Sequence, residues 1–470
     1  MSAFKSGESE NEIEAGSNPH ILDEMERMEM KSKTGVSRRN FMETTGKGVT
    51  TLAAVMSTAP AVLSARSPNE VIGAGCIGLG VRGGTLLKQA TRVEGVTVTA
   101  LCDVYQGHVQ KGVEWCMNPD VHPYVDYHEL LADASVDAVI IATPDHWHAK
   151  MLMDAANAKK GVYVEKGWTR SIAEAKAMRA AVKQNDIIMQ LGHQSRESAA
   201  GMQASRLIAE GALGPVTLVR IGRFENRPLG MNVWRWYGDY NQYVRPEEAQ
   251  VKKDVDWKRW LGDTPVIPFN MERFWHWRCY WDYGTGVAGD LLSHEIDFVQ
   301  SVLRHGIPDT CICAGLNALL DDGREVPDTW NTIYHFEQAG RTVSFDCSMN
   351  SNGMIQVPEF YGKEAVLQCN GIAQDVSDFV VYPESSSVKY GPQIEAGKIT
   401  PGKPFMRFDT SKTPEQPTHM EDFFNGVRNH KKTKCNEDEA FIEASTILMS
   451  VAALKEKREV RWNRDKEDIV

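Results

Sequence analysis

Short apolar runs follow one another between residues 71 and 191, and stretches of helical pattern separate most of them. Apolar runs without polar alternation are typical of strands that are buried on both faces. Strands that alternate with helices predict a parallel, doubly wound sheet, which binds ligands at the carboxyl ends of its strands. The predicted strands are 71–77, 96–101, 136–143, 161–165 and 187–191.

After Pro308 the pattern changes to short segments in which apolar and polar positions alternate. This alternation predicts an antiparallel sheet with one face on helices and the other face free. The predicted strands here are 310–314, 332–336, 342–347, 355–361 and 365–369. Residues 374–415 are rich in Ser, Pro, Gly and Lys and predict surface loops, and after them we expect helices at 420–427 and 439–455 and a strand at 459–462.

A glycine-rich turn follows the first predicted strand. Gly78, Gly80 and Gly83 form the pattern G-x-G-x-x-G, and Asp103 closes the next strand. The first glycine permits a tight turn, the second lets the backbone approach a pyrophosphate, and the third lets the helix pack closely on the strand. An acid about 20 residues further on binds the ribose hydroxyls in such sites. The combination predicts a dinucleotide site.

The expected fold class is α/β, with an N-terminal Rossmann domain and a C-terminal α+β domain whose sheet is open and mainly antiparallel. A chain of 470 residues exceeds one hydrophobic core, which agrees with more than one domain. The expected boundaries are 1–65 for a disordered lead and export signal, 70–195 for the nucleotide domain, 196–462 for the substrate domain and 463–470 for a tail.

The expected cofactor is NAD, because the carboxylate of Asp103 repels the 2′-phosphate of NADP. NADP stays an alternative, since Arg82 lies near the turn and could read that phosphate. The residues predicted to contact the cofactor are Gly78, Gly80, Val81, Arg82, Gly83, Asp103, Thr143, Pro144, Asp145, His148, Glu165 and Lys166.

Two further motifs end predicted strands: Thr143-Pro144-Asp145-His146-Trp147-His148, and Val164-Glu165-Lys166-Gly167. With the glycine turn, they resemble the glucose–fructose oxidoreductase / inositol dehydrogenase (Gfo/Idh/MocA) family over about 71–462. That family carries Glu-Lys-Pro where this chain has Glu165-Lys166-Gly167, so the lysine is kept and a rigid turn element is lost. The resemblance implies a sugar or cyclic polyol as substrate, and a free sheet face that mediates homodimer or homotetramer contacts.

A buried polar stripe marks the helix that begins near Gly289. Asp290, His294 and Asp297 are spaced to lie along one helix face, while apolar residues cover the rest of the helix. The residues alone leave two readings open: a helix cap with a satisfied core histidine, or catalytic groups. The family has Asp-x-x-x-His at this place, supplying catalytic residues together with the lysine. The resemblance therefore implies that Lys166, Asp290 and His294 are catalytic.

The expected reaction is hydride transfer from a secondary alcohol, with His294 as the general base and Lys166 stabilising the developing alkoxide. The alternative is an NAD-dependent glycosidase or lyase, in which a ring hydroxyl is oxidised only transiently. That reaction needs a second base, for which His193, Tyr237, Tyr240, Tyr280 and Tyr283 are candidates. Most of the twelve tryptophans lie within residues 230–283, where they could line a carbohydrate site or form an ordinary aromatic core.

The N-terminal segment predicts export. Arg38 and Arg39 precede a moderately apolar, small-residue stretch at 49–65 that contains an A-x-A-like site at Ala59-Pro60-Ala61. This arrangement is typical of a twin-arginine signal, which predicts the twin-arginine translocase as a partner and a periplasmic location. The apolar stretch is too short to span a bilayer permanently. Because this route carries folded proteins, we expect a tightly bound cofactor that is loaded before export.

Composition narrows the remaining classes. The net charge of −11 argues against nucleic acid or an anionic membrane as the main partner. Nine scattered cysteines without a C-x-x-C motif indicate neither a disulfide framework nor a zinc site. His146 and His148 lack an evident third ligand, so no metal is expected.

Overall fold

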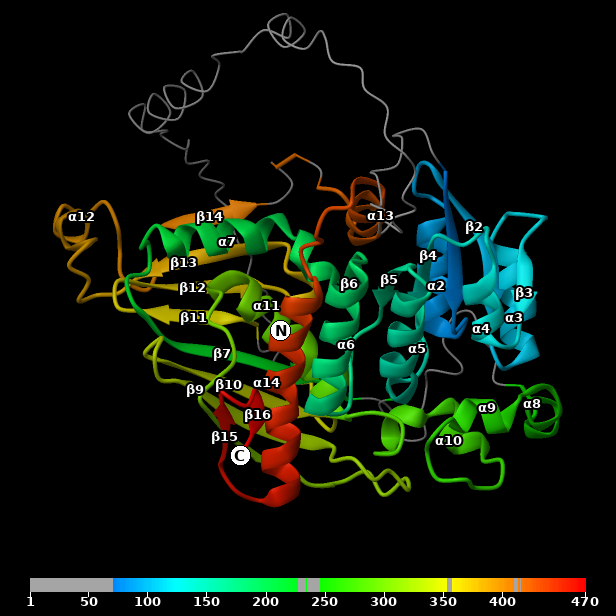
Figure 1. Ribbon diagram of the computed structural model, residues 1–470. Helices are drawn as coiled ribbons and strands as arrows, with labels where there is room; N and C mark the ends of the chain where they lie inside the picture. The colour runs from blue at the N-terminus through cyan, green and yellow to red at the C-terminus, as the bar shows by residue number, and fades with distance from the viewer. Residues whose placement is uncertain (1–70, 227–233, 235–245, 353–356, 410–412, 415) are drawn as a thin grey trace, which may run out of the picture. The chain divides into compact units, whose positions relative to one another are not determined.

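The computed structural model describes residues 71–226, 234, 246–352, 357–409, 413–414 and 416–470 (Figure 1). The predicted lead and export signal at 1–65 lie outside the described residues, as do Tyr237 and Tyr240. The described residues all belong to one compact unit.

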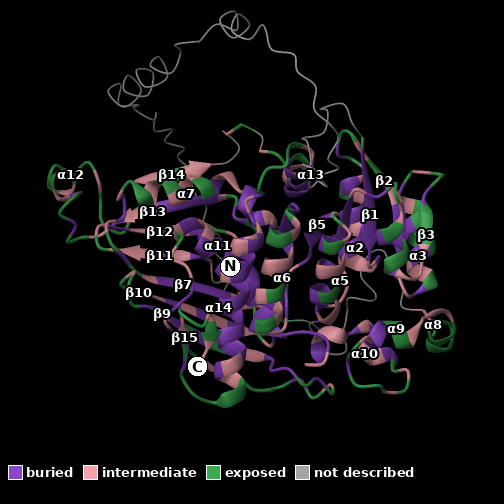
Figure 2. Cartoon of the chain, in the orientation of Figure 1, coloured by how far each residue is buried: buried purple, intermediate pink, exposed green. Residues whose placement is uncertain are grey.

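The first sheet has six parallel strands in the order β3-β2-β1-β4-β5-β6 (Figure 1). The doubly wound parallel sheet is thereby confirmed. The strands β1, β4 and β5 are buried along their whole length, as their unbroken apolar runs require (Figure 2). The six strands are β1 Ile72–Ile77, β2 Val96–Cys102, β3 His122–Tyr124, β4 Ala138–Ile141, β5 Gly161–Val164 and β6 Met189–Leu191.

Helices connect these strands and begin at recognisable caps. The hydroxyl of Ser171 accepts a hydrogen bond from the Glu174 N–H and starts α6. The carboxylate of Asp126 caps α4 in the same way. The helices are α2 Val81–Ala90, α3 Gln106–Trp115, α4 Tyr127–Ala132, α5 Asp145–Asn157 and α6 Ile172–Asn185.

The second sheet has ten strands in the order β14-β13-β12-β11-β7-β10-β9-β8-β15-β16. Its pairs are antiparallel except for β7 and β10, which run parallel at its centre. The predicted mainly antiparallel sheet is confirmed. The strands are β7 Val216–Phe224, β8 Thr310–Ala314, β9 Thr329–Phe336, β10 Arg341–Ser348, β11 Glu359–Gly362, β12 Ala365–Asn370, β13 Asp378–Pro383, β14 Met406–Asp409, β15 Val460–Asn463 and β16 Asp468–Ile469.

One expectation for this part is wrong. Residues 374–415 are not all surface loop, because β13 and β14 extend the sheet there and α12 (Gly391–Glu395) lies between them. The segment Phe379–Val381 is buried between more polar neighbours, and the average composition of the stretch hides this short apolar run. β7 was also missed, since it lies outside the β-rich region that begins at Pro308.

Three helices cover one face of the second sheet: α7 Ala199–Ala209, α11 Ser293–Leu303 and α14 Glu437–Glu456 (Figure 1). Alternate side chains of β9 are buried, which agrees with a sheet that has only one covered face. The helix α14 also contacts α6 and β6 of the first sheet. Through α14 and the core that surrounds it, the two sheets share buried structure.

Candidate active site

The glycine turn joins β1 to α2 at the carboxyl end of the first sheet. Gly78 has a φ of +84°, a conformation that side chains rarely adopt. A Cβ on Gly83 would lie 1.8 Å from the carbonyl oxygen of Gly78, so only glycine allows this close approach of helix to strand. A Cβ on Gly80 would meet only the His108 ring, at 3.8 Å. A side chain at this position would therefore occupy the space over the turn that a pyrophosphate site requires.

The carboxylate of Asp103, just after β2, helps to shape this turn. It accepts hydrogen bonds from the Leu79 N–H at 2.7 Å and the Tyr105 N–H at 2.9 Å, and the His108 Nδ1 lies 3.1 Å from it. A carboxylate can accept about four hydrogen bonds. These contacts are thus compatible with a ribose hydroxyl as a further donor.

A cavity of about 450 Å³ runs from the glycine turn to the beginning of the buried helix. Most of the predicted site residues line it together, although they come from segments far apart in the sequence. They are Gly78, Gly80, Val81, Arg82, Asp103, Thr143, Pro144, Glu165, Lys166, Asp290 and His294. Gly83, Asp145 and His148 lie outside this lining.

Lys166 and Asp290 form the centre of the site. The Lys166 ammonium donates to the Asp290 carboxylate at 2.5 Å and to the Asp290 carbonyl oxygen at 2.8 Å. The Trp234 indole N–H and the Arg278 guanidinium also donate to this carboxylate. Although burial raises the pKa of Asp290, the charges of Lys166 and Arg278 hold it well below its usual range. Asp290 is thus an ionised anchor for Lys166.

His294 lies one step further along the same segment. The chain makes a π-helical turn at Ala288–Leu292 before α11 begins at Ser293, and both Asp290 and His294 line the cavity. π-Helical turns are frequent at functional sites. Burial lowers the pKa of His294 well below its usual value, and the nearby charges of Lys166 and His193 lower it further. His294 is therefore a neutral imidazole at neutral pH, able to accept a proton.

Asp145 and His148 lie behind this centre. Asp145 lines a small cavity next to Lys166 and Gly167, and burial raises the pKa of its carboxyl to about 7. His148 is fully buried, with its two ring nitrogens 2.8 Å from the Gly167 carbonyl oxygen and 2.9 Å from that of Thr143. His148 thereby stabilises the loops from which Thr143 and Lys166 extend, and direct contact of Asp145 and His148 with a cofactor stays a prediction.

A segment between β7 and β8 covers the Asp103 end of the cavity. This roof segment consists of α8 Glu248–Asp254, α9 Trp257–Leu261 and α10 Met271–Trp275. The Asp256 N–H donates to the Val104 carbonyl oxygen at 2.8 Å, and Val255 forms a β-bridge with Tyr105. Phe274 and Trp275 pack near the Tyr105 and His108 rings. The roof segment thereby encloses this end of the site.

Sequence reasoning missed several cavity residues. Arg278 and Trp234 hold Asp290, yet neither stands in a motif, and Trp234 lies 56 residues from its partner. Arg259 and His128 line the cavity near the roof segment. Of the candidates for a second base, His193 is buried behind His294, and neither Tyr280 nor Tyr283 lines the cavity.

Arg82, considered above as a reader of the 2′-phosphate, has another partner. Its guanidinium donates to the buried Glu165 carboxylate at 2.7 Å and lies 3.4 Å from the Gln194 side-chain oxygen. These bonds direct Arg82 toward the end of β5, away from Asp103 at the end of β2.

The described residues form neither a metal cluster nor a membrane-spanning helix. No three His, Cys, Asp or Glu side chains among them are grouped as metal ligands would be. Within the same residues, no helix has the length and apolar character to cross a membrane.

Comparison with known families explains this arrangement. A family model for the oxidoreductase family with an NAD-binding Rossmann fold matches residues 71–193, and the model for its C-terminal alpha/beta domain matches residues 201–349. Together they cover more than half of the chain. The chain belongs to the Gfo/Idh/MocA oxidoreductase family. Its six-stranded parallel sheet is the NAD-binding domain of that family.

Individual relatives match shorter stretches. The inositol 2-dehydrogenase of Salmonella typhimurium is 32% identical over 155 residues, which are 33% of this chain and 46% of that protein. The alpha-N-acetylgalactosaminidase of Shewanella oneidensis is 39% identical over 103 residues, 20% of this chain and 22% of that protein. The chain thus spans about half, or less, of the length of the curated relatives that it matches.

A solved structure shows the same fold. The aldose-aldose oxidoreductase from Caulobacter crescentus, complexed with glycerol, aligns over 83% of this chain and 100% of its own, with a TM-score of 0.61 and 17% identity.

The lining of the cavity matches what a dinucleotide requires. The lack of a side chain at Gly80, the left-handed Gly78 and the N-terminus of α2 meet the requirements of a pyrophosphate. The carboxylate of Asp103 lines the same cavity and can accept a further hydrogen bond, as from a ribose hydroxyl. The residues present therefore fit NAD.

The glycine turn yields a paired prediction. Gly83→Ala should lower stability by about 1–3 kcal/mol or more, because its Cβ would meet the Gly78 carbonyl oxygen. Gly80→Ala should leave the melting temperature nearly unchanged and weaken NAD binding, because its Cβ enters the space over the turn. Thermal unfolding and NAD titration of both variants test this. Equal melting temperatures for the two variants would contradict it.

Proposed function

We propose that this protein is an NAD-dependent oxidoreductase that acts on a secondary alcohol of a sugar or cyclic polyol. The observation that carries the proposal is the convergence of Lys166, Asp290 and His294 on one cavity that begins at the glycine turn. The family and its inositol dehydrogenase member support the reaction class. Trp277, which lines the cavity beside Arg278 and so near Asp290, supports a carbohydrate substrate, because a sugar packs its C–H face on aromatic rings.

Each central residue has a distinct chemical role. The neutral His294 accepts the proton of the substrate hydroxyl. The Lys166 ammonium faces the same oxygen and stabilises the charge that develops there. Asp290 is held ionised and fixes the ammonium through two bonds, so Lys166 needs no reorganisation during the reaction.

The cofactor would lie along the glycine turn. When bound, NAD accepts a hydride from the carbinol carbon. The Gly78 and Gly80 backbone would hold the pyrophosphate, and Asp103 would accept from the ribose hydroxyls. Thr143 and Pro144, which follow β4, would contact the part of the cofactor nearer to Lys166. The roof segment supports tight retention, because it encloses the Asp103 end through main-chain contacts with Val104 and Tyr105.

The second candidate function is redox-neutral cleavage of a glycoside through transient oxidation of the sugar ring. The similarity to the Shewanella oneidensis alpha-N-acetylgalactosaminidase favours it, as does an enclosed site that would keep its cofactor between turnovers. Both functions use the same three central residues.

One experiment separates the two functions. The protein is purified without added nucleotide, its bound nucleotide is measured, and free sugars and glycosides are then offered separately. Accumulation of NADH with free sugars or polyols supports the dehydrogenase. Glycoside cleavage without net NADH supports the second function, and a lack of both reactions across the panels contradicts both.

Removal of the central side chains should abolish most of the turnover. We expect Lys166→Ala, Asp290→Asn and His294→Ala each to lower kcat by about two to four orders of magnitude, the range of a positioned acid, base or alkoxide-stabilising group. The His294→Ala variant should keep its melting temperature and NAD affinity nearly unchanged.

A matched control is His146→Ala. His146 is a half-buried histidine that does not line the cavity, and its Nε2 lies 2.9 Å from the Trp260 carbonyl oxygen. This variant should lose melting temperature while its single-turnover rate per folded molecule is retained. If His294→Ala behaves in this way instead, His294 is a core histidine and not the base.

Cofactor choice should follow Asp103. Wild-type protein should bind NAD more tightly than NADP, and Asp103→Ser should narrow the difference at some cost in stability, because the Leu79 and Tyr105 N–H groups lose an acceptor. Arg82→Ala is the control and should leave the preference unchanged, since Glu165 already pairs with Arg82. Equilibrium titration with both nucleotides measures this, and tighter binding of NADP to the wild type would contradict it.

Export to the periplasm through the twin-arginine translocase is part of the proposal. The support is the pair Arg38-Arg39 ahead of an apolar, small-residue stretch. Changing both arginines to lysine should retain the precursor in the cytoplasm, as cell fractionation would measure. Unchanged periplasmic recovery of the double-lysine variant would point to a different signal.

A further inference from the structure

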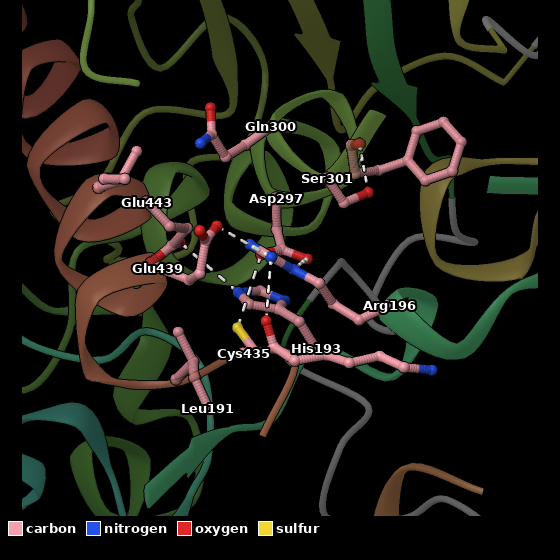
Figure 3. Close-up of polar contacts among 12 residues, drawn as sticks. Leu191, His193, Arg196, Asp297, Gln300, Ser301, Cys435, Glu439 and Glu443 are labelled. Carbon is pink, nitrogen blue, oxygen red and sulfur yellow. Dashed lines mark hydrogen bonds and ion pairs between the residues drawn. The ribbon is translucent and has the colours of Figure 1, made fainter. Parts of the chain in front are cut away.

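A buried polar cluster lies behind His294, on the side that the reaction as described does not use. This inner cluster consists of His193, Arg196, Asp297, Cys435, Glu439 and Glu443 (Figure 3). His193 and Arg196 follow β6, Asp297 lies on α11 one turn beyond His294, and the two glutamates lie on α14. The cluster thus forms where the first sheet meets the helices of the second.

One half of the inner cluster is well paired. The Arg196 guanidinium donates to Asp297 at 3.0 Å and 2.7 Å, and to Glu439 at 2.9 Å. Cys435 also donates to the Asp297 carboxylate, at 3.7 Å. Asp297 and Arg196 are therefore an ion pair whose charges compensate each other inside the protein.

The other half is His193 and Glu443, and both side chains are fully buried. Neither the two ring nitrogens of His193 nor the two carboxyl oxygens of Glu443 have a hydrogen-bond partner among the described residues. The His193 Nε2 lies 3.7 Å from the Glu443 Oε1, which is within ion-pair reach and longer than a hydrogen bond. Four unpaired polar atoms in one buried place require an explanation.

A proton shared by His193 and Glu443 would explain these unpaired atoms. An isolated carboxylate at this depth would be costly, and so would an isolated imidazolium. One proton shared by the two groups avoids both, and the nearby Asp297 carboxylate favours its place on His193, as imidazolium with carboxylate.

The position of His193 lets its proton influence His294. The rings of His193 and His294 meet edge to face, with 5.3 Å between their centroids. The His294 Nδ1 is buried on the inner side, without a partner among the described residues. A positive charge on His193 therefore acts on His294 through protein and not through bulk water.

We propose that His193 and Glu443 hold one proton behind His294, and that the resulting charge on His193 keeps His294 in its neutral, proton-accepting form. The proposal rests on the proposed function only in treating His294 as the base. His193 acts through His294 and is a positioning residue.

The surrounding charges agree with this assignment. Although burial lowers the pKa of His193, the carboxylates of Asp297 and Glu443 raise it, and Arg196 opposes them. Burial raises the pKa of Glu443, and its interaction with His193 offsets part of this rise. The charged or titratable groups that act on His294 itself are Lys166 after β5, His193 after β6, Arg223 on β7 and Asp290 in the π-helical turn.

The test measures the protonation of His294 directly. Protein labelled with ¹⁵N-histidine is titrated by NMR as purified, with its bound nucleotide, and the His294 signals are assigned with His294→Gln. In the Glu443→Gln variant His193 loses the carboxylate that holds its proton, so the protonation midpoint of His294 should rise by about one to two pH units. The acid limb of kcat/KM should move to higher pH with it.

Two further variants serve as a control and as a substitute if Glu443→Gln does not fold. Glu439→Gln is the matched control, because Glu439 lies one turn away on α14 and pairs with Arg196, so the His294 midpoint should stay within about 0.3 pH unit. If Glu443→Gln does not fold, His193→Gln should raise the same midpoint by removing the charge itself.

The results separate this inference from the proposed function. An unchanged His294 midpoint in both Glu443→Gln and His193→Gln overturns the inference, even if the enzyme oxidises sugars. A raised midpoint supports the inference about the pair, and if no sugar, polyol or glycoside reacts, only the proposed function has failed.

Discussion

The buried ion pair between Lys166 and Asp290 is the interaction on which the site depends. Lys166 extends from the end of β5 in the first sheet, and Asp290 from the π-helical turn ahead of α11 in the second part. A buried pair of this kind adds little net stability, but removal of one partner leaves a charge without compensation. The pair therefore fixes the end of β5 against the start of α11. His294 and the glycine turn face the same cavity only when these two elements are correctly placed.

Much of the first sheet could be predicted, because its signals are local. An unbroken apolar run of four to seven residues leaves few alternatives to a buried strand, and the spacing of Gly78, Gly80 and Gly83 has a steric meaning at each position. The convergence of Lys166, Asp290 and His294 was expected from family resemblance and not from physics. Residues separated by 124 positions carry no local sign that they touch.

What escaped prediction depends on packing. The π-helical turn at Ala288–Leu292 has the composition of an ordinary helix, and the contacts of Asp290 with Lys166, Arg278 and Trp234 distinguish it. Arg278 carries no motif, and β13 lies in a stretch whose average composition resembles a loop. The partner of Arg82 could not be inferred either, since Glu165 is 83 residues away. In each case the deciding neighbour is remote in sequence.

The parallel pairing of β7 with β10 bears on how the chain folds. These strands form the centre of the second sheet, yet β7 ends at Phe224 and β10 begins at Arg341. The chain between them must be closed into a loop before either strand gains its central neighbour, and such long-range pairing slows folding. During synthesis β7 therefore lacks its central partner strand until residue 348 has emerged from the ribosome. In that interval the core residues of β7, such as Val219 and Ile221, are exposed without a partner strand, and any assistance from chaperones should be concentrated there.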